Sequence, residues 1–373
     1  MINVIPKKIK LLYNSLSAFK RDNLANSFQT MYQIQPSKRI NKGSEVFYFE
    51  KELESLPKKF KFKEEKISTD KFIEETNTTG IIVISNDKIK YENYFLGANE
   101  NTLLSSNSVC KSFVSALLGI AISEGYINSV NEPIGNYVPE LKNTELEKIS
   151  IKDCLQMSSG IDFDEDTDMS KMSISMLLGK PAIKYISKLK LEIQPGTLRK
   201  YSSINTEIIG EVITNATGCS LSDYLENKIW KRIGVENDAY WTLSNNKELA
   251  MGGLSISLRD YARFAKIYLN NGKFNNEQII PSKWIEESID IREYHLRPGV
   301  NNDSYNTFGY GYKWWIPEGN EKEFMAIGIY SQWIYINLSK NVIIVKTSAH
   351  PGFMDKDHEL KTLALFRSIV GNL

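Results

Sequence analysis

The chain has few of the side chains that hold transition metals or build disulfide frameworks. Its 373 residues include only three histidines (His295, His350 and His358) and three cysteines (Cys110, Cys154 and Cys219). The histidines are too scattered to indicate a metal site, and the cysteines are odd in number and form no C-x-x-C pair. We therefore expect no metal, no cofactor and no disulfide framework. Such cysteine usage fits a reducing, cytoplasmic compartment.

Features typical of nucleic-acid or membrane proteins are also missing. The formal net charge is +1, and no basic block is interleaved with aromatic residues. No apolar run reaches the roughly 18 residues of a membrane helix. The first 23 residues start with basic side chains, but Asn14, Ser15 and Ser17 interrupt their apolar run, which favours a helix over a signal peptide. We expect a small-molecule substrate as the partner.

The sequence shows no βαβ alternation, no Gly-rich phosphate loop and no internal repeat. Strand-like runs lie near the two ends of the chain instead. Residues 80–97 are typical of a β-hairpin around the turn pair Asn86-Asp87. Residues 323–349 indicate two strands around Ser339-Lys340.

Between these runs, residues from about 131 to 320 are mainly helical in pattern with long loops. Residues 257–272 have apolar residues at helical spacing and stop at Asn271-Gly272. A further helix is expected at about 356–370. One antiparallel sheet built from both ends of the chain, with an inserted helical region, explains this order. The prediction is an α/β (α+β) domain over 66–373, preceded by a polar, lysine-rich extension over 1–65.

The stretch "SVCKSFVSALLGIAIS" places a lysine, Lys111, at the front of twelve uncharged residues and three positions after Ser108. On a helix these two side chains share one face. A serine hydroxyl is a weak nucleophile unless a neighbour takes its proton. Burial against an apolar helix disfavours the charged form of a lysine. The pattern therefore favours Ser108 as a nucleophile and Lys111 as its base.

Ser-x-x-Lys is a short pattern that also arises by chance. It also occurs at Ser17/Lys20, Ser55/Lys58, Ser68/Lys71, Ser85/Lys88, Ser187/Lys190 and Ser244/Lys247. None of these six copies has an apolar helix behind it. No G-x-S-x-G motif is present to mark a different serine. Cys110 is expected on another side of the helix, as a buried apolar residue rather than a nucleophile.

At these residues the sequence resembles the serine β-lactamase and penicillin-binding-protein superfamily, whose first motif is Ser-x-x-Lys. It is most similar to the class C-like branch that contains esterases and 6-aminohexanoate-dimer hydrolases. The resemblance runs from about residue 80 to 350. It includes the collinear segments "LQMSSGIDF", "PGTLRKYSSINTEIIGEVITNATG" and "MGGLSISLRDYARFAKIYLNNG". The resemblance implies a β-lactamase-like fold and a serine hydrolase.

The resemblance also implies roles for particular residues. Ser108 would be the acylated nucleophile and Lys111 its partner. Tyr201 matches the tyrosine of the Tyr-x-Asn/Ser motif, with Ser203 in the third position as a substrate-binding residue. The turn at 195–197 and the helix that follows distinguish Tyr201 from chance copies of this motif. In the family this phenol shuttles protons to the leaving group.

The third family motif, usually Lys/His-Thr-Gly on an edge strand, is aligned with Ala326-Ile327-Gly328, where the cation is lost. Ile327 and Gly328 would contact the substrate, and the N–H groups of Ile329 and Ser108 would form the oxyanion hole. Lys346-Thr347-Ser348 resembles the motif but lies at the end of the next strand, so we reject it.

Two further features lie near these motifs. His350 is a candidate site residue because it is expected to face Ile329 across the hairpin. The acidic run at 162–168 lacks the turn glycine and closing glutamate of an EF-hand, because Thr167 and Ser173 occupy those positions. It is either a solvated loop or, as in relatives, a border of the active site that repels anions or receives an amine.

We predict hydrolysis of small esters or linear amides through an acyl-enzyme on Ser108. Within enzymes, the alternative is a β-lactamase or a D-alanyl-D-alanine carboxypeptidase. From another class, the alternative is a non-catalytic binding module that keeps the fold. Such a module would not need Ser108, Lys111 and Tyr201 together.

Overall fold

A computed structural model describes residues 17–299, 308–355 and 357–373. The helix expected over residues 1–23 therefore lies largely outside the described residues. The main sheet has the order β13-β14-β15-β16-β17-β5-β6-β2. Its strands are β13 (Gly309–Tyr310), β14 (Trp315–Ile316), β15 (Glu323–Gly328), β16 (Gln332–Asn337), β17 (Val342–Ser348), β5 (Thr78–Ser85), β6 (Lys88–Tyr94) and β2 (Glu50–Lys51).

The expected sheet built from both ends of the chain is confirmed. Strand β5 pairs with β17 in the antiparallel direction, and this pairing joins the N-terminal hairpin to the C-terminal strands. The turn of that hairpin is formed by Asn86 and Asp87, both with positive φ, as the favoured two-residue hairpin turn requires. At the edge, β2 pairs with β6 in the parallel direction.

A second sheet and two short hairpins complete the strands. The second sheet joins β1 (Ser37–Ile40), β8 (Ala239–Ser244), β10 (Leu254–Ser257) and β7 (Leu103–Ser105), with β9 (Lys247–Glu248) paired to β8. The hairpins are β3–β4 (Lys59–Phe62 and Glu65–Ser68) and β11–β12 (Lys273–Phe274 and Glu277–Gln278). The segment 131–320 thus contains short strands as well as helices, and residues 17–65 contribute strands to both sheets.

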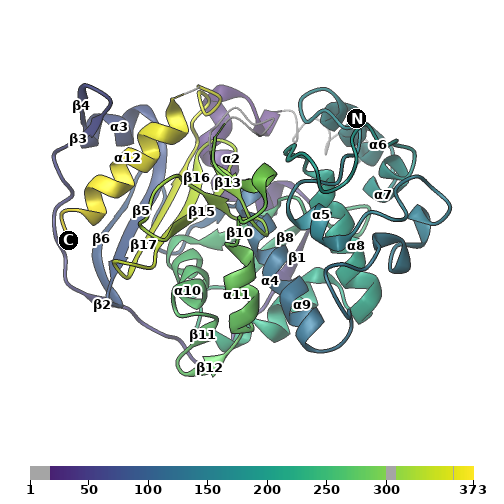
Figure 1. The fold of residues 1–373 in the computed structure, drawn as a ribbon. Helices are drawn as coiled ribbons and strands as arrows, with labels where there is room; N and C mark the ends of the chain where they lie inside the picture. Colours follow the sequence, from purple (N-terminus) through teal and green to yellow (C-terminus); the bar gives the residue numbers. More distant parts are fainter. Residues whose placement is uncertain (1–16, 300–307, 356) are drawn as a thin grey trace, which may run out of the picture.

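The helices cover both faces of the main sheet. They are α2 (Leu24–Ile34), α3 (Thr69–Glu75), α4 (Cys110–Ser123), α5 (Ile151–Leu155), α6 (Asp168–Leu177), α7 (Ala182–Ile186), α8 (Ile204–Thr217), α9 (Leu221–Lys228), α10 (Leu258–Leu269), α11 (Ser282–Ser288) and α12 (His358–Val370). Figure 1 shows α12 lying across one face of the sheet, while α5 to α9 gather on the side of the molecule away from it.

Alternation along β5 explains why the sheet is covered on both faces. Ile81 and Val83 belong to the same apolar cluster as the α12 residues Leu363 and Phe366. The intervening Ile82 and Ile84 belong to the larger cluster that contains α4 and α10. Because successive side chains of a strand point to opposite faces, one uninterrupted apolar run serves both layers.

One expectation for the C-terminal strands is wrong. Residues 323–349 form three strands, not two, because the chain turns between Gly328 and Gln332 as well as near Ser339. Tyr330 and Ser331 occupy the first of these turns with φ of 61° and 71°. Neither residue type is the Gly or Asn that normally marks such a turn. The sequence therefore gave little local signal for it.

Candidate active site

Ser108 lies where the chain passes from β7 into α4. A single turn of 3₁₀-helix, Asn107–Val109, precedes the α-helix. Asn107 has φ of 44°, a conformation in which asparagine is several-fold enriched. All residues from Cys110 to Ala121 are buried, so α4 runs through the core and holds Ser108 at one end. This rigid support fixes the serine at the border between the core and a cavity.

Lys111 is buried beside Ser108, as the apolar helix predicted. Its side chain is 2% exposed, and Nζ lies 2.7 Å from Ser108 Oγ. Nζ also donates to the carbonyl oxygen of Met251 at 2.7 Å. These two contacts aim the amine at the serine hydroxyl, at the distance that proton transfer requires.

Cys110, the neighbouring alternative, is fully buried, with Sγ 3.7 Å from the carbonyl oxygen of Ala250. Burial raises the pKa of the Cys110 thiol well above its ordinary value. Because the thiolate is the reactive form, this cysteine is not a competing nucleophile.

Tyr201 is half-buried, and aromatic packing fixes its ring. It stacks on Trp315 with centroids 5.6 Å apart and meets Tyr310 edge-on at 6.3 Å. Lys111 Nζ lies 5.4 Å from the centre of the Tyr201 ring. The structure therefore brings together Ser108, Lys111 and Tyr201, which the sequence placed almost a hundred residues apart.

The end of β15 lies directly against Ser108. A Cβ atom built on Gly328 would be 3.0 Å from the Ser108 nitrogen and 2.8 Å from the Ser106 carbonyl oxygen, so only glycine allows this approach. Asn107 Nδ2 donates to the Ile329 carbonyl oxygen at 3.0 Å, which ties the following turn to the same place. Ile327, Gly328 and Ile329 all line the cavity that contains Ser108.

The rejected motif at Lys346 lies on the next strand but one, β17. Its side chain is completely buried, and Nζ donates to Ser348 Oγ at 2.6 Å. Burial lowers the pKa of Lys346 to about 7. Lys346 is not among the described residues that line the cavity. Lys346 therefore contributes no cation to the wall of this cavity.

Ser203 lines the cavity and is bonded to the acidic loop. Its Oγ donates to Glu165 Oε1, and its backbone N–H donates to Glu165 Oε2 at 2.8 Å. Ser203 is the residue before α8, so the carboxylate lies at the helix N-terminus, where negative charge is stabilised. Asp164, Glu165 and Asp166 all line the cavity. Of the two interpretations of the acidic run, the structure supports the second, in which the run borders the candidate site.

His350 is placed differently from the sequence expectation. Its backbone N–H bonds to the Tyr330 carbonyl oxygen at 3.2 Å, but its ring lies 4.5 Å from the ring of His358. Among the described residues, those that line the cavity include His358 and not His350. His358 Nε2 bonds to Ser331 Oγ at 2.9 Å, and burial lowers the pKa of His358 to about 2. The cavity wall here is polar, and Glu359 lines it beside His358.

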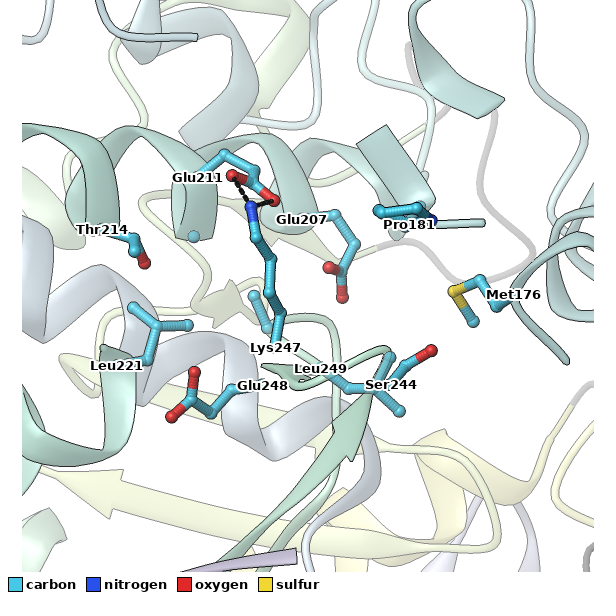
Figure 2. A pocket seen from close by; sticks show the side chains of 13 residues that line it. Met176, Pro181, Glu207, Glu211, Thr214, Leu221, Ser244, Lys247, Glu248 and Leu249 are labelled. Atoms are coloured by element: carbon cyan, nitrogen blue, oxygen red, sulfur yellow. Dashed lines mark hydrogen bonds and ion pairs between the residues drawn. The ribbon is translucent and has the colours of Figure 1, made fainter. Parts of the chain in front are cut away.

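Glu207 is a residue behind the site that sequence reasoning missed. It is a buried carboxyl on α8, and Oε1 accepts the Met251 N–H at 2.8 Å. The carbonyl oxygen of Met251 holds Lys111 Nζ, so one residue separates the buried acid from the amine. Burial raises the pKa of Glu207 to about 7. Figure 2 shows its carboxyl beside the Lys247–Glu211 ion pair but not part of it.

A sequence signal for Glu207 did exist. It is the only charged residue in "INTEIIG", within a helix whose first seven residues are buried. Like Lys111, it is a charged residue within a buried stretch of helix, although α8 carries a second charge at Glu211.

The cavity over Ser108 has a volume of about 1250 Å³, which exceeds the roughly 300–1000 Å³ typical of small-molecule sites. Among the described residues, no group of three or more His, Cys, Asp or Glu side chains could hold a metal ion. Over the same residues, no helix combines the length and apolar content that a membrane crossing needs. The arrangement is a serine hydroxyl, an adjacent amine and a nearby phenol in a roomy pocket.

Comparison with known proteins agrees with this arrangement. The family model described as "Beta-lactamase" matches residues 69–367. A 6-aminohexanoate-dimer hydrolase from Paenarthrobacter ureafaciens is 26% identical over 293 residues, which cover 75% of this chain and 74% of that protein.

Solved structures share the fold. A Bacillus anthracis protein provisionally named 6-aminohexanoate-dimer hydrolase superposes with a TM-score of 0.86 at 24% identity, covering 95% of each chain. A class C β-lactamase mutant superposes with a TM-score of 0.59 at 17% identity, covering 82% of this chain and 95% of that one. The predicted fold class is therefore confirmed. The chain belongs to the β-lactamase family and is a serine hydrolase of that superfamily.

Proposed function

We propose that the enzyme hydrolyses carboxylic esters or linear amides through an acyl-enzyme formed on Ser108. The observation that carries the proposal is the 2.7 Å contact between Ser108 Oγ and the buried Lys111 Nζ at the wall of a large cavity. A buried amine that only stabilised the fold would not need to approach a cavity-lining hydroxyl.

In the proposed first step, Ser108 Oγ attacks the substrate carbonyl carbon while Lys111 Nζ takes the Oγ proton. The carbonyl oxygen gains the negative charge and accepts hydrogen bonds from the N–H groups of Ser108 and Ile329. Tyr201 then gives a proton to the leaving alcohol or amine, and the bond to it breaks. In the second step water attacks the ester on Ser108, with the same groups moving its protons in reverse.

The pocket supports a substrate without a carboxylate near the reacting bond. Ala326 occupies the position where relatives carry a cation, and the loop at 164–166 contributes three acidic side chains to the wall. A linear amide with an amine group suits this charge, in keeping with the name of the Paenarthrobacter relative. As part of the same proposal, the enzyme works in the cytoplasm, which its three free cysteines support.

The experiment is covalent labelling with a fluorophosphonate, followed by intact mass and peptide mapping. One adduct is expected on Ser108, and Ser108→Ala should abolish both labelling and turnover of p-nitrophenyl butanoate. Ser187→Ala is a matched control, because Ser187 also precedes a lysine, Lys190, by three positions. Labelling of Cys110, or no labelling, would contradict the assignment.

A further inference from the structure

Large apolar side chains on the surface of this protein are concentrated at one place. Among the described residues, twelve large hydrophobic side chains are exposed. Six of them line the cavity that contains Ser108: Phe19, Ile174, Leu177, Leu178, Ile329 and Met354. Single exposed hydrophobic residues are normal on a protein surface, but a group of them around a pocket marks a binding site. We call these six side chains the apolar rim.

The apolar rim is assembled from separate parts of the chain. Ile174 and Leu177 lie on α6, and Leu178 is its C-terminal cap residue. The amide of Asn245 donates to the carbonyl oxygens of Met176 and Lys180, both at 3.1 Å, which fixes the end of this helix. These two bonds hold the end of α6, with Leu177 and Leu178, in place at the cavity wall.

Aromatic contacts join the remaining part of the rim. Tyr330 packs between Phe19 and Phe353, with ring centroids 6.2 Å and 4.7 Å away. Phe353 and its neighbour Met354 both line the cavity. Ile329, which precedes Tyr330, is 44% exposed. The apolar surface therefore starts at the proposed oxyanion hole and continues outward to the surface.

The cavity wall also has polar side chains, including Ser108 and Lys111 at the proposed reaction and the acidic loop at 164–166. The six residues of the apolar rim add a set of apolar contacts to this wall. The volume of about 1250 Å³ exceeds what a small ester needs. We infer, on the basis of the proposed function, that the substrate carries a long unbranched hydrocarbon chain on its acyl side. The scissile carbonyl would lie at Ser108 and the chain along the apolar rim.

The test is a series of p-nitrophenyl esters from acetate to octanoate, each below its micelle-forming concentration. Complete burial of one methylene group is worth about fourfold in binding. An open rim buries each group only in part, so kcat/KM should rise about tenfold from butanoate to octanoate. A flat or falling series would overturn the inference. Turnover of acetate by Ser108 would still leave the proposed function intact, whereas no turnover of any ester and no Ser108 adduct would remove both.

Variants connect the preference to the rim. Leu178→Ser and Met354→Ser should each lower the octanoate-to-acetate ratio of kcat/KM by about threefold or more. Both side chains are more than half exposed, and a thermal melt will verify that the variants fold. Leu53→Ser is the matched control, because Leu53 is equally exposed but does not line the cavity, and its ratio should not change.

Two further outcomes count against the inference. An unchanged ratio in both rim variants would place the chain elsewhere in the cavity. Loss of a dimer in gel filtration of Leu178→Ser, with the ratio unchanged, would assign the rim to contact with a second copy of this chain.

Discussion

Replacing Glu207 with glutamine should remove a pH dependence of stability that this buried carboxyl creates. Burial raises its pKa from 4.5 to about 7. A raised acid pKa gives stability that is complete below pH 4.5 and is lost as the pH rises through 7. Each pKa unit is worth about 1.4 kcal/mol, so by pH 8 the wild type should have lost about 3 kcal/mol of its free energy of unfolding through this group.

Glutamine has nearly the same shape and keeps an oxygen that can accept the Met251 N–H. It does not ionise, so the stability of Glu207→Gln relative to wild type should rise by about 3 kcal/mol between pH 4 and pH 8. Urea unfolding of both proteins at several pH values measures this difference. Glu286→Gln, a change at an exposed glutamate, is the control and should show no such rise. A difference that stays constant with pH would refute the argument.

Two other predictions concern the reaction. Lys111→Ala and Tyr201→Phe should each lower kcat at least about 10²-fold, and the double variant should lose far less than the product of the two, because groups that act as a unit are not additive. Fully additive losses in ester assays would show that the two residues act separately. Because Ala326 supplies no cation, kcat/KM for p-nitrophenyl butanoate should exceed that for benzylpenicillin; the reverse order would mean that the third motif is misplaced.

Much of the fold could be predicted because its signals are local. The turn pair Asn86-Asp87 marked the hairpin at 80–97, and the lone charge before an apolar run marked Lys111 and with it the helix that supports Ser108. The order of strands and helices along the chain indicated a sheet shared by both ends. The first two features depend on neighbouring residues, and the third on the order of elements along the chain, all of which a sequence shows directly.

The parts that could not be predicted depend on contacts between distant segments. The bond from Ser203 to Glu165 joins residues 38 positions apart, and the contact of His358 with Ser331 joins residues 27 positions apart. The turn at Tyr330 and Ser331 was missed because neither residue favours positive φ on its own. Tertiary packing imposes that conformation, and the strand count changed with it.

The pairing of β5 with β17 also has a consequence for synthesis of the protein. Roughly 260 residues separate these two strands. A ribosome adds about 5–20 residues per second, so β5 waits roughly 10 to 50 s for its partner. During this time the run "GIIVIS", which is apolar on both faces, uncharged and free of proline, has one open edge.

We therefore expect the nascent hairpin to be prone to aggregation until β17 pairs with it. Gly328, which lies against Ser108, is made only late in translation, so the surroundings of Ser108 are completed late as well. A truncation before β17 should yield insoluble chains that keep the Ser-x-x-Lys sequence but have no hydrolase activity.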